Sequence, residues 1–244
     1  KMILITRPNE EAKILKDELT KQGVTCIINS LISFKLNFKQ IPFNKKNYYL
    51  ISSVQSVKTL SKYKKKYLKL LQGGEFLVIG SKVASELKKI CLPKILKVTE
   101  DTDAMLKFLI KNKLSIIQSR KIIFLSGSVV NKYFLQEVKK NNISLKRVVL
   151  YSVKPLLLRP ATVKLIKEGR ISHILLYSGY TAEILIKQIR AKRLQNAMFK
   201  IKVFSLSNRI NEIVKKSSLF KKIYVSKKPS QKSIISLLRL KKAQ

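Results

Sequence analysis

Residues 48–57 read YYLISSVQSV, a short apolar run that ends in two serines and continues into a helical segment. An apolar run of this length followed by an amphipathic stretch is typical of a strand and its helix in a βα unit. The same arrangement recurs along the 244 residues of the chain. The sequence therefore predicts an α/β protein built around parallel sheets.

Ten segments are predicted to be strands. They are residues 2–6, 25–29, 48–52, 76–80, 95–99, 121–125, 145–151, 173–177, 201–205 and 222–225. Ten strands are too many for one small sheet, and two extended segments, 31–38 and 148–158, interrupt the βα rhythm. We expect these segments to be a two-stranded β connector between two flavodoxin-like domains with parallel sheets of five strands. The predicted domains are residues 1–33 with 155–244, and residues 38–149.

Five of the predicted strands end in a turn that is rich in serine or glycine and is expected to open a helix. These turns are residues 52–56, 79–82, 125–128, 177–181 and 206–209. Small and hydroxyl residues can cap a helix and leave backbone N–H groups open, so each turn is a predicted anion cradle. Ligands of open α/β sheets bind beyond the carboxyl ends of the strands, where these turns lie. The turns match neither GxGxxG nor GxxxxGK[ST], which argues against a dinucleotide or P-loop phosphate site.

The formal net charge of +39 is the most unusual feature of the composition. Such a field attracts polyanions, which include nucleic acid, acidic membrane surfaces and substrates with many carboxylates. Biased amino-acid usage is the alternative explanation, because the excess lysine is spread along the chain. The charge alone therefore identifies no partner.

The cysteines, the histidine and the hydropathy narrow the class of protein. Cys26 and Cys91 lie in separate segments, so we interpret both as core residues and expect neither a disulfide nor a metal site. His173 is the only histidine and has no ligand-like companions, which argues against zinc and against histidine-based catalysis. No apolar run approaches the roughly 18 residues of a membrane span, and the start KMILITRPNE lacks a signal-peptide layout. We expect a cytoplasmic protein with no membrane partner.

A series of short motifs follows in a fixed order. They are ILITRP at 3–8, Gly23, SLI at 30–32, YLISSVQSV at 49–57, VIG at 78–80, LSG at 125–127, VLYSV at 149–153, ILLYS at 174–178 and KPS at 228–230. In order and spacing these motifs resemble those of the uroporphyrinogen-III synthase family over nearly the whole chain. The family's threonine in V-G-x-x-T-A corresponds to Val83, and the pair in I-G-x-T-T-A corresponds to Arg209 and Ile210.

Two further positions differ from the family pattern. Ser172 stands where the family has an Asp, and Asn131, followed by Lys132, stands where an Arg is frequent. These departures concern side-chain contacts rather than the fold.

The resemblance implies a reaction and a mechanism. The substrate would be hydroxymethylbilane, a linear tetrapyrrole with acetate and propionate groups, which is closed to uroporphyrinogen III with inversion of ring D and loss of water. The resemblance implies no cofactor and no metal, a site in the cleft between the two domains, and a monomer that makes transient contact with the preceding deaminase. Positioning would supply most of the catalytic effect.

Tyr151 matches the family's cleft tyrosine and is the one predicted catalytic residue, donating a proton or hydrogen bond to the departing hydroxyl. A tyrosine packed in the connector with its hydroxyl in solvent is the alternative. The substrate carboxylates are expected on turn amides and nearby cations. The predicted substrate-binding residues are Arg7, Ser52, Ser53, Gly80, Ser81, Lys82, Gly127, Ser128, Lys132, Ser178, Gly179, Ser207 and Asn208.

Two other functions remain open on the sequence. The main alternative is a basic two-domain protein that binds nucleic acid or a small anion without catalysis. Only residues 63–67, with two tyrosines around three lysines, come near an aromatic platform for nucleic acid, so no specific nucleic acid is expected. A two-lobed receptor for a small ligand is the second alternative.

Overall fold

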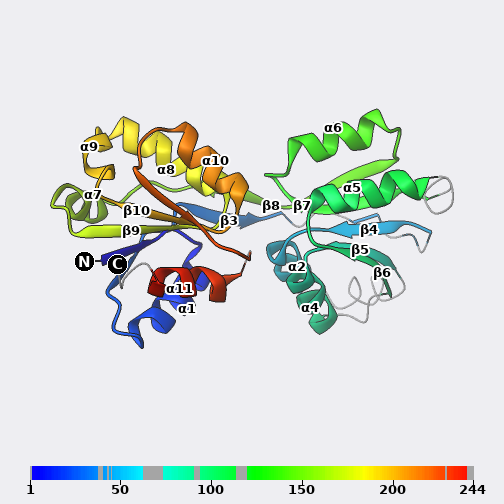
Figure 1. Ribbon diagram of the computed structural model, residues 1–244. Helices are drawn as coiled ribbons and strands as arrows, with labels where there is room; N and C mark the ends of the chain where they lie inside the picture. The colour runs from blue at the N-terminus through cyan, green and yellow to red at the C-terminus, as the bar shows by residue number, and fades with distance from the viewer. Residues whose placement is uncertain are drawn as a thin grey trace. The chain divides into compact units, whose positions relative to one another are not determined.

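The computed structural model describes residues 2–37, 41–42, 44, 46–62, 74–90, 94–113, 120–228 and 230–240, with the side chains of 239 and 240 excepted. Cys91, Pro229 and the segment 63–67 lie outside the described residues. The chain divides into two compact units. Unit 1 comprises Lys1–Ser33 and Lys154–Gln244, and unit 2 comprises Phe34–Val153. Figure 1 shows a sheet with helices on both faces in each unit.

Unit 1 holds a five-stranded parallel sheet in the order β11-β10-β9-β1-β2. Its elements are β1 (Met2–Ile5), α1 (Asn9–Thr20), β2 (Cys26–Ile28), α7 (Pro160–Lys167), β9 (Ile171–Leu176), α8 (Gly179–Ala191), α9 (Gln195–Met198), β10 (Lys202–Ser205), α10 (Asn208–Lys216), β11 (Lys222–Val225) and α11 (Gln231–Leu240). Helices α7 to α10 pack on one face of this sheet, and α1 and α11 pack on the other. Two apolar cores result, one on each face.

Unit 2 holds a six-stranded sheet in the order β3-β8-β7-β4-β5-β6. Its elements are β3 (Ile32–Leu36), β4 (Tyr48–Ile51), α2 (Val54–Leu60), β5 (Glu75–Ile79), α4 (Ser81–Ile90), β6 (Lys94–Thr99), α5 (Thr102–Lys111), β7 (Ile122–Gly127), α6 (Lys132–Lys140) and β8 (Leu145–Pro155). Tyr49 and Ile51 face α2 and α4, while Tyr48 and Leu50 face α5 and α6. This alternation, with every residue of β4 buried, is typical of a strand inside a parallel sheet.

The predicted α/β class with parallel sheets is confirmed, and all ten predicted strands are present. The second sheet differs from expectation in having six strands instead of five. The reason is that the predicted strand 145–151 and the predicted connector 148–158 form one continuous strand, β8, which β3 joins at the sheet edge. The backbone N–H of Asn37 donates to the carbonyl of Leu150 at 2.8 Å at this edge.

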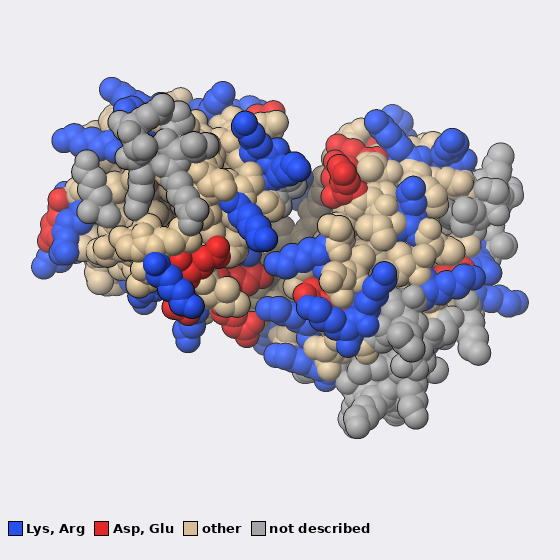
Figure 2. Space-filling view, turned by 60° about the horizontal axis from the view of Figure 1, so that its bottom comes forward, with Lys and Arg blue, Asp and Glu red and all other residues tan. Residues whose placement is uncertain are grey.

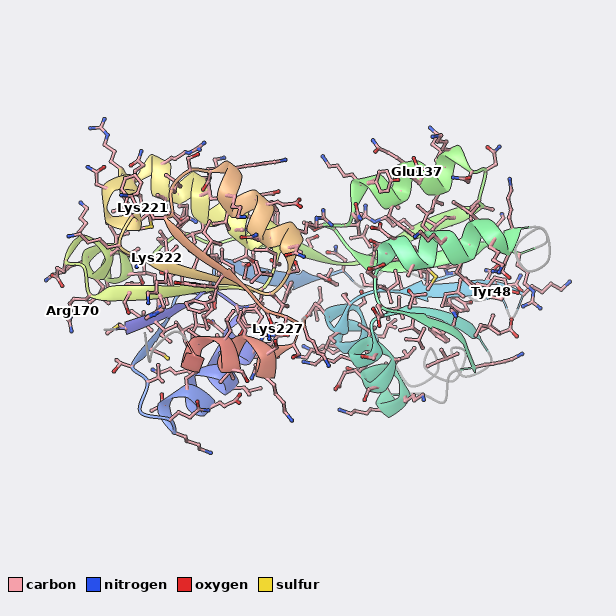
Figure 3. All side chains as sticks on the ribbon, in the orientation of Figure 1. Tyr48, Glu137, Arg170, Lys221, Lys222 and Lys227 are labelled. Atoms are coloured by element: carbon pink, nitrogen blue, oxygen red, sulfur yellow. The ribbon has the colours of Figure 1, made fainter. Side chains whose placement is uncertain are left out.

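Among the described residues, no helix is both long and apolar enough to cross a bilayer. Cys26 lies in the core of unit 1, as expected of a small apolar residue. Lysine and arginine side chains are scattered over the face of each unit that Figure 2 shows. In unit 1, Lys221 and Lys222 stand at the start of β11, and Lys227 follows its end (Figure 3). The positive charge in these views does not gather over a single element.

Candidate active site

A register shift in β8 determines where Tyr151 points. Ser126 of β7 pairs with Val149, but the next residue, Gly127, pairs with Tyr151, so that Leu150 is an extra residue in β8. Such a bulge changes the alternation of side chains between the two faces of a sheet. Leu150 and Tyr151 consequently lie in the same apolar core, against α2 and α4. Without the shift, Tyr151 would face the opposite side of the sheet.

The ring of Tyr151 is held in place by close packing. A Cβ atom on Gly127 would lie 2.4 Å from Cζ and 2.5 Å from Cε2 of this ring, so that only glycine fits beneath it. Phe34 of β3 packs edge-on against Tyr151, with ring centroids 5.3 Å apart and planes at 83°. Tyr151 is 6% exposed, so the phenol does not extend freely into solvent as the alternative interpretation of the sequence had it.

A chain of three hydroxyls leads from Tyr151 to the start of α2. The hydroxyls of Tyr151 and Ser53 share a hydrogen bond of 3.0 Å, and those of Ser53 and Ser56 share one of 2.8 Å. Ser53 is the N-cap of α2, and its Oγ also accepts from the backbone N–H of Ser56 at 3.0 Å. Because serine hydroxyls rotate, Tyr151 can either donate to Ser53 or accept from it.

Burial raises the pKa of Tyr151 above the ordinary tyrosine value of 10.0, because it penalises the charged phenolate. Hydrogen bonds from Ser53 and Ser56 and the positive charge of Arg147 act in the opposite direction on this pKa. The phenol is therefore neutral at neutral pH, which is the protonation state that a general acid requires.

Arg147 of β8 binds the turn at the end of β7. Its Nε donates to Ser126 Oγ at 2.9 Å, and its Nη2 donates to the carbonyls of Gly127 and Ser128. Ser128 in turn donates its N–H to the carbonyl of Tyr151 at 2.8 Å, and its Oγ accepts from the N–H of Val153 at 2.8 Å. The polar groups of Gly127 and Ser128 are thus largely used within the protein.

The turn 125–128 does not open a helix, contrary to the prediction. Helix α6 begins only at Lys132, and Asn131 is its N-cap, accepting from the N–H of Tyr133 at 3.1 Å. The physical reason is that Gly127 still belongs to β7 and Ser128 is bonded to β8. Lys132 itself is exposed on the first turn of α6.

The other predicted turns do precede helices. Ser178 caps α8 by accepting from the N–H of Thr181 at 3.1 Å, and Ser207 is the N-cap residue of α10 without a side-chain cap bond. Gly80 has a φ of +96°, a conformation that glycine adopts without strain, and it precedes α4. The remaining predicted residues stand at the same helix starts. They are Ser52 before the N-cap of α2, exposed Ser81 and Lys82 at the start of α4, Gly179 at the start of α8, and exposed Asn208 at the start of α10.

Arg7 is engaged by its own unit. Its Nε donates to Glu11 at 3.0 Å, its Nη1 donates to Gln231 at 2.8 Å, and its guanidinium lies 4.2 Å from the centroid of the Tyr177 ring. Gln231 also donates to Glu18 at 2.7 Å. These contacts tie α1 to α11, and they place a carboxylate of the protein on the cation that was predicted to bind a substrate carboxylate.

The structure brings Ser53, Gly127 and Tyr151 together in unit 2, whereas Arg7 and Ser178 belong to unit 1. The sequence interpretation missed Ser56 and Arg147. Ser56 lies within the predicted turn 52–56, but only its contact with Ser53 shows that it belongs to the site. Arg147 belongs to no motif, and because Lys146 beside it is a cation too, the sequence of the strand does not single it out.

Within the described part of the chain, no three His, Cys, Asp or Glu side chains are grouped so that they could hold a metal ion. The ring of His173 lies beside Ser172 and Phe204. Its Nδ1 lies 2.7 Å from Ser172 Oγ, and its ring centroid lies 5.6 Å from that of Phe204.

Comparison with known proteins gives a match over almost the full length. The family model described as uroporphyrinogen-III synthase HemD matches residues 3–236. The structure of uroporphyrinogen-III synthetase from Helicobacter pylori is similar with a TM-score of 0.68 and 15% identity, over 98% of this chain and 99% of that one. A mutant uroporphyrinogen III synthase from the extremely thermophilic bacterium Thermus thermophilus gives a TM-score of 0.65 and 14% identity, over 99% and 97% of the two chains. No curated protein matched the sequence.

Proposed function

The chain belongs to the uroporphyrinogen-III synthase family, and we propose that Tyr151 is the general acid of the reaction that this family performs. The protein is a cyclising lyase of haem biosynthesis, and its substrate is a linear polypyrrole. The observation that carries the proposal for Tyr151 is its geometry: a buried, neutral phenol whose hydroxyl lies 3.0 Å from Ser53 Oγ at the carboxyl end of the unit 2 sheet.

Loss of the terminal hydroxyl of hydroxymethylbilane is the step that an acid assists. Hydroxide is a poor leaving group, but a proton from the Tyr151 phenol converts it to water as the carbon–oxygen bond breaks. The electron-rich pyrrole supplies the electrons for this step. Attack at ring D through the spiro intermediate, followed by ring closure, releases a proton that can restore the phenol. The balance of the reaction is therefore the loss of one water molecule.

The Ser53 and Ser56 hydroxyls support this role. As the phenol gives up its proton, hydrogen bonds to its oxygen stabilise the negative charge that develops there. The positive charge of Arg147 acts in the same direction. The site thus combines a proton held at neutral pH with neighbours that favour its release in the transition state.

We assign the substrate carboxylates to the helix starts of each unit. Exposed Lys82 and Lys132 and the N–H groups at the starts of α4, α8 and α10 are the proposed contacts. Arg7, Gly127 and Ser128 have protein partners instead, so we assign them to holding the structure rather than the substrate. Ser53 acts through Tyr151.

The test supplies hydroxymethylbilane to the purified protein, oxidises the products and separates the type III isomer from type I. Wild-type protein should form type III, and spontaneous closure alone gives type I. Tyr151→Phe should keep the fold and slow type III formation on the order of 100-fold or more, the usual contribution of a positioned acid. The matched control is Tyr133→Phe, because Tyr133 is 55% exposed and lies on α6 of the same unit.

Two outcomes would contradict the proposal. Type I alone from wild-type protein would remove the synthase function from this chain. Normal turnover of Tyr151→Phe, alongside an active wild type, would remove Tyr151 from the mechanism but leave the family function intact.

We also propose that the protein is a cytoplasmic monomer that receives its substrate by transient contact with the preceding deaminase. The fate of the substrate supports the contact, because hydroxymethylbilane that is left in solution closes spontaneously. Sedimentation at several protein concentrations tests the monomer. A competition assay tests the contact. Inactive Tyr151→Phe protein is added to the coupled reaction of the deaminase and the wild-type protein. If it competes with wild-type protein for the deaminase, it should lower the yield of type III relative to type I.

A further inference from the structure

Arg147 is a half-buried cation whose hydrogen bonds all go to one short turn. Its Nε and Nη2 donate to Ser126 Oγ and to the carbonyls of Gly127 and Ser128. All three acceptors are neutral, and among the described residues no ion pair links this guanidinium to a carboxylate. Partial burial of a cation among neutral groups costs free energy, so an arginine at this position needs a structural or functional explanation.

The turn that Arg147 holds packs against the ring of Tyr151 through Gly127. The Cα of Gly127 is so close to the phenol ring that an added Cβ would lie 2.7 Å from the hydroxyl oxygen. Ser128 is bonded through its N–H to the backbone of Tyr151 and through its Oγ to the backbone of Val153. A displacement of this turn would therefore move both the ring and the strand that carries it.

We propose that Arg147 is a positioning residue for Tyr151, fixing the turn 126–128 so that the phenol hydroxyl stays on Ser53. The inference deepens the proposed function and rests on it, because it assumes that Tyr151 is the acid. Arg147 holds the turn through Ser126, Gly127 and Ser128, and its positive charge acts on the phenol in addition. It is not assigned a contact with substrate.

The chemistry of the side chain explains why arginine occupies this position. A guanidinium is planar and presents several N–H donors in a fixed fork, so it can join three acceptors of one turn at once. A lysine ammonium is a point charge on a flexible stem and cannot reproduce that geometry. Arg147→Lys therefore keeps the positive charge and removes most of the positioning, whereas Arg147→Met removes both.

The experiment measures kcat and KM for type III formation in Arg147→Lys and Arg147→Met. The control is Lys146→Met, which removes one positive charge from an exposed neighbour on the same strand. We expect kcat to fall on the order of 10- to 100-fold in both Arg147 variants, as small displacements of a catalytic group do, with KM and the control nearly unchanged. In a Tyr151→Phe background, Arg147→Lys should change kcat by less than about twofold, because residues that act as a unit are not additive.

Three outcomes overturn the inference while wild-type protein remains active. They are a normal kcat in both Arg147 variants, a raised KM with normal kcat, which would indicate a direct substrate contact, and a full loss of kcat that persists in the Tyr151→Phe background. If wild-type protein forms only type I, the proposed function has failed, and hydrogen exchange then decides the inference separately. The amides of Ser128 and Val153 should exchange on the order of 10-fold faster in Arg147→Met than in Lys146→Met. Equal exchange rates would overturn the role of Arg147 in holding the turn.

Discussion

Gly127→Ala is expected to damage the protein only because Tyr151 is present. The φ of Gly127 lies outside the positive range that favours glycine, so an alanine backbone is unstrained there. The added Cβ would instead lie 2.4 Å from Cζ, 2.5 Å from Cε2 and 2.7 Å from the hydroxyl oxygen of Tyr151. Because a phenol ring is rigid, the whole side chain or the turn must move to relieve these three contacts.

Two opposing effects set the size of the change in stability. Overpacking a core costs about 1–3 kcal/mol, whereas replacing an unstrained glycine by alanine gains about 0.4–1 kcal/mol through the unfolded state. Gly127→Ala should therefore lower the free energy of unfolding by about 1–2 kcal/mol. Tyr151→Leu removes the three atoms that clash, so in that background the same substitution should be neutral or stabilising by up to about 1 kcal/mol.

Urea unfolding of the four proteins in this cycle measures the free energies, and the isomer assay measures type III formation. Gly179→Ala is the matched control, because its Cβ would lie 2.8 Å from Ile213 Cδ1, the end of a side chain that can rotate away. We expect the control to lose less stability than Gly127→Ala. A clash with Tyr151 is excluded as the cause if Gly127→Ala lowers the free energy of unfolding equally with Tyr151 and with Leu at position 151, or if it leaves both stability and turnover at wild-type values.

Three further predictions rest on the described contacts. Ser53→Ala and Asp101→Ala each remove a helix N-cap, and each should lower the free energy of unfolding in urea by about 1 kcal/mol. Only Ser53→Ala should also slow type III formation, because only Ser53 contacts Tyr151. Glu75 pairs with two cations, which lower its pKa from the ordinary value of 4.5. The stability that the ionised carboxylate contributes is therefore present above pH 4.5 and is lost as the pH falls below that value. Glu75→Gln should show a smaller loss of stability between about pH 7 and pH 3 than wild type. Burial raises the pKa of Tyr177 from 10.0 to about 12, so stability that is complete below pH 10 is lost as pH rises towards 12, and Tyr177→Phe should lack this component in unfolding measured across that range.

The sheets were predictable from the sequence because local patterns determine them. Residues 48–51 are all apolar, which is what a strand buried on both faces requires, and the serine that follows caps the next helix. The sequence predicts that 31–38 and 148–158 are extended and paired, and β3 and β8 are neighbours in the structure. It does not predict that this pair belongs to the sheet of unit 2. The side-chain pattern of a strand shows that it is extended, but not which further strand it joins across more than 100 residues of sequence.

The details of the site are tertiary and had no comparable local signal. The segment VVLYSV at 148–153 contains no glycine or proline to mark a bulge, so nothing local indicates the register shift that determines the face of Tyr151. The sequence predicts that Arg7 is a cation open to substrate, because Gln231, which contacts it, is 224 residues away in the sequence. Ser53, by contrast, was found because capping is a local property that its turn already expresses.

The positions of the side chains explain two of the departures from the family pattern, Val83 and Ile210. Val83 and Ile210 stand where the resemblance places threonines, and they are 6% and 4% exposed in the apolar cores beneath α4 and α10. A side chain at either position is directed towards the sheet, where a hydroxyl would have to find a partner or lose its hydration. In this chain both positions therefore contribute packing. Hydroxyl chemistry is then left to the network of Ser53, Ser56 and Tyr151, which needs neither threonine, because its geometry is set by the bulge in β8 and by the cap of α2.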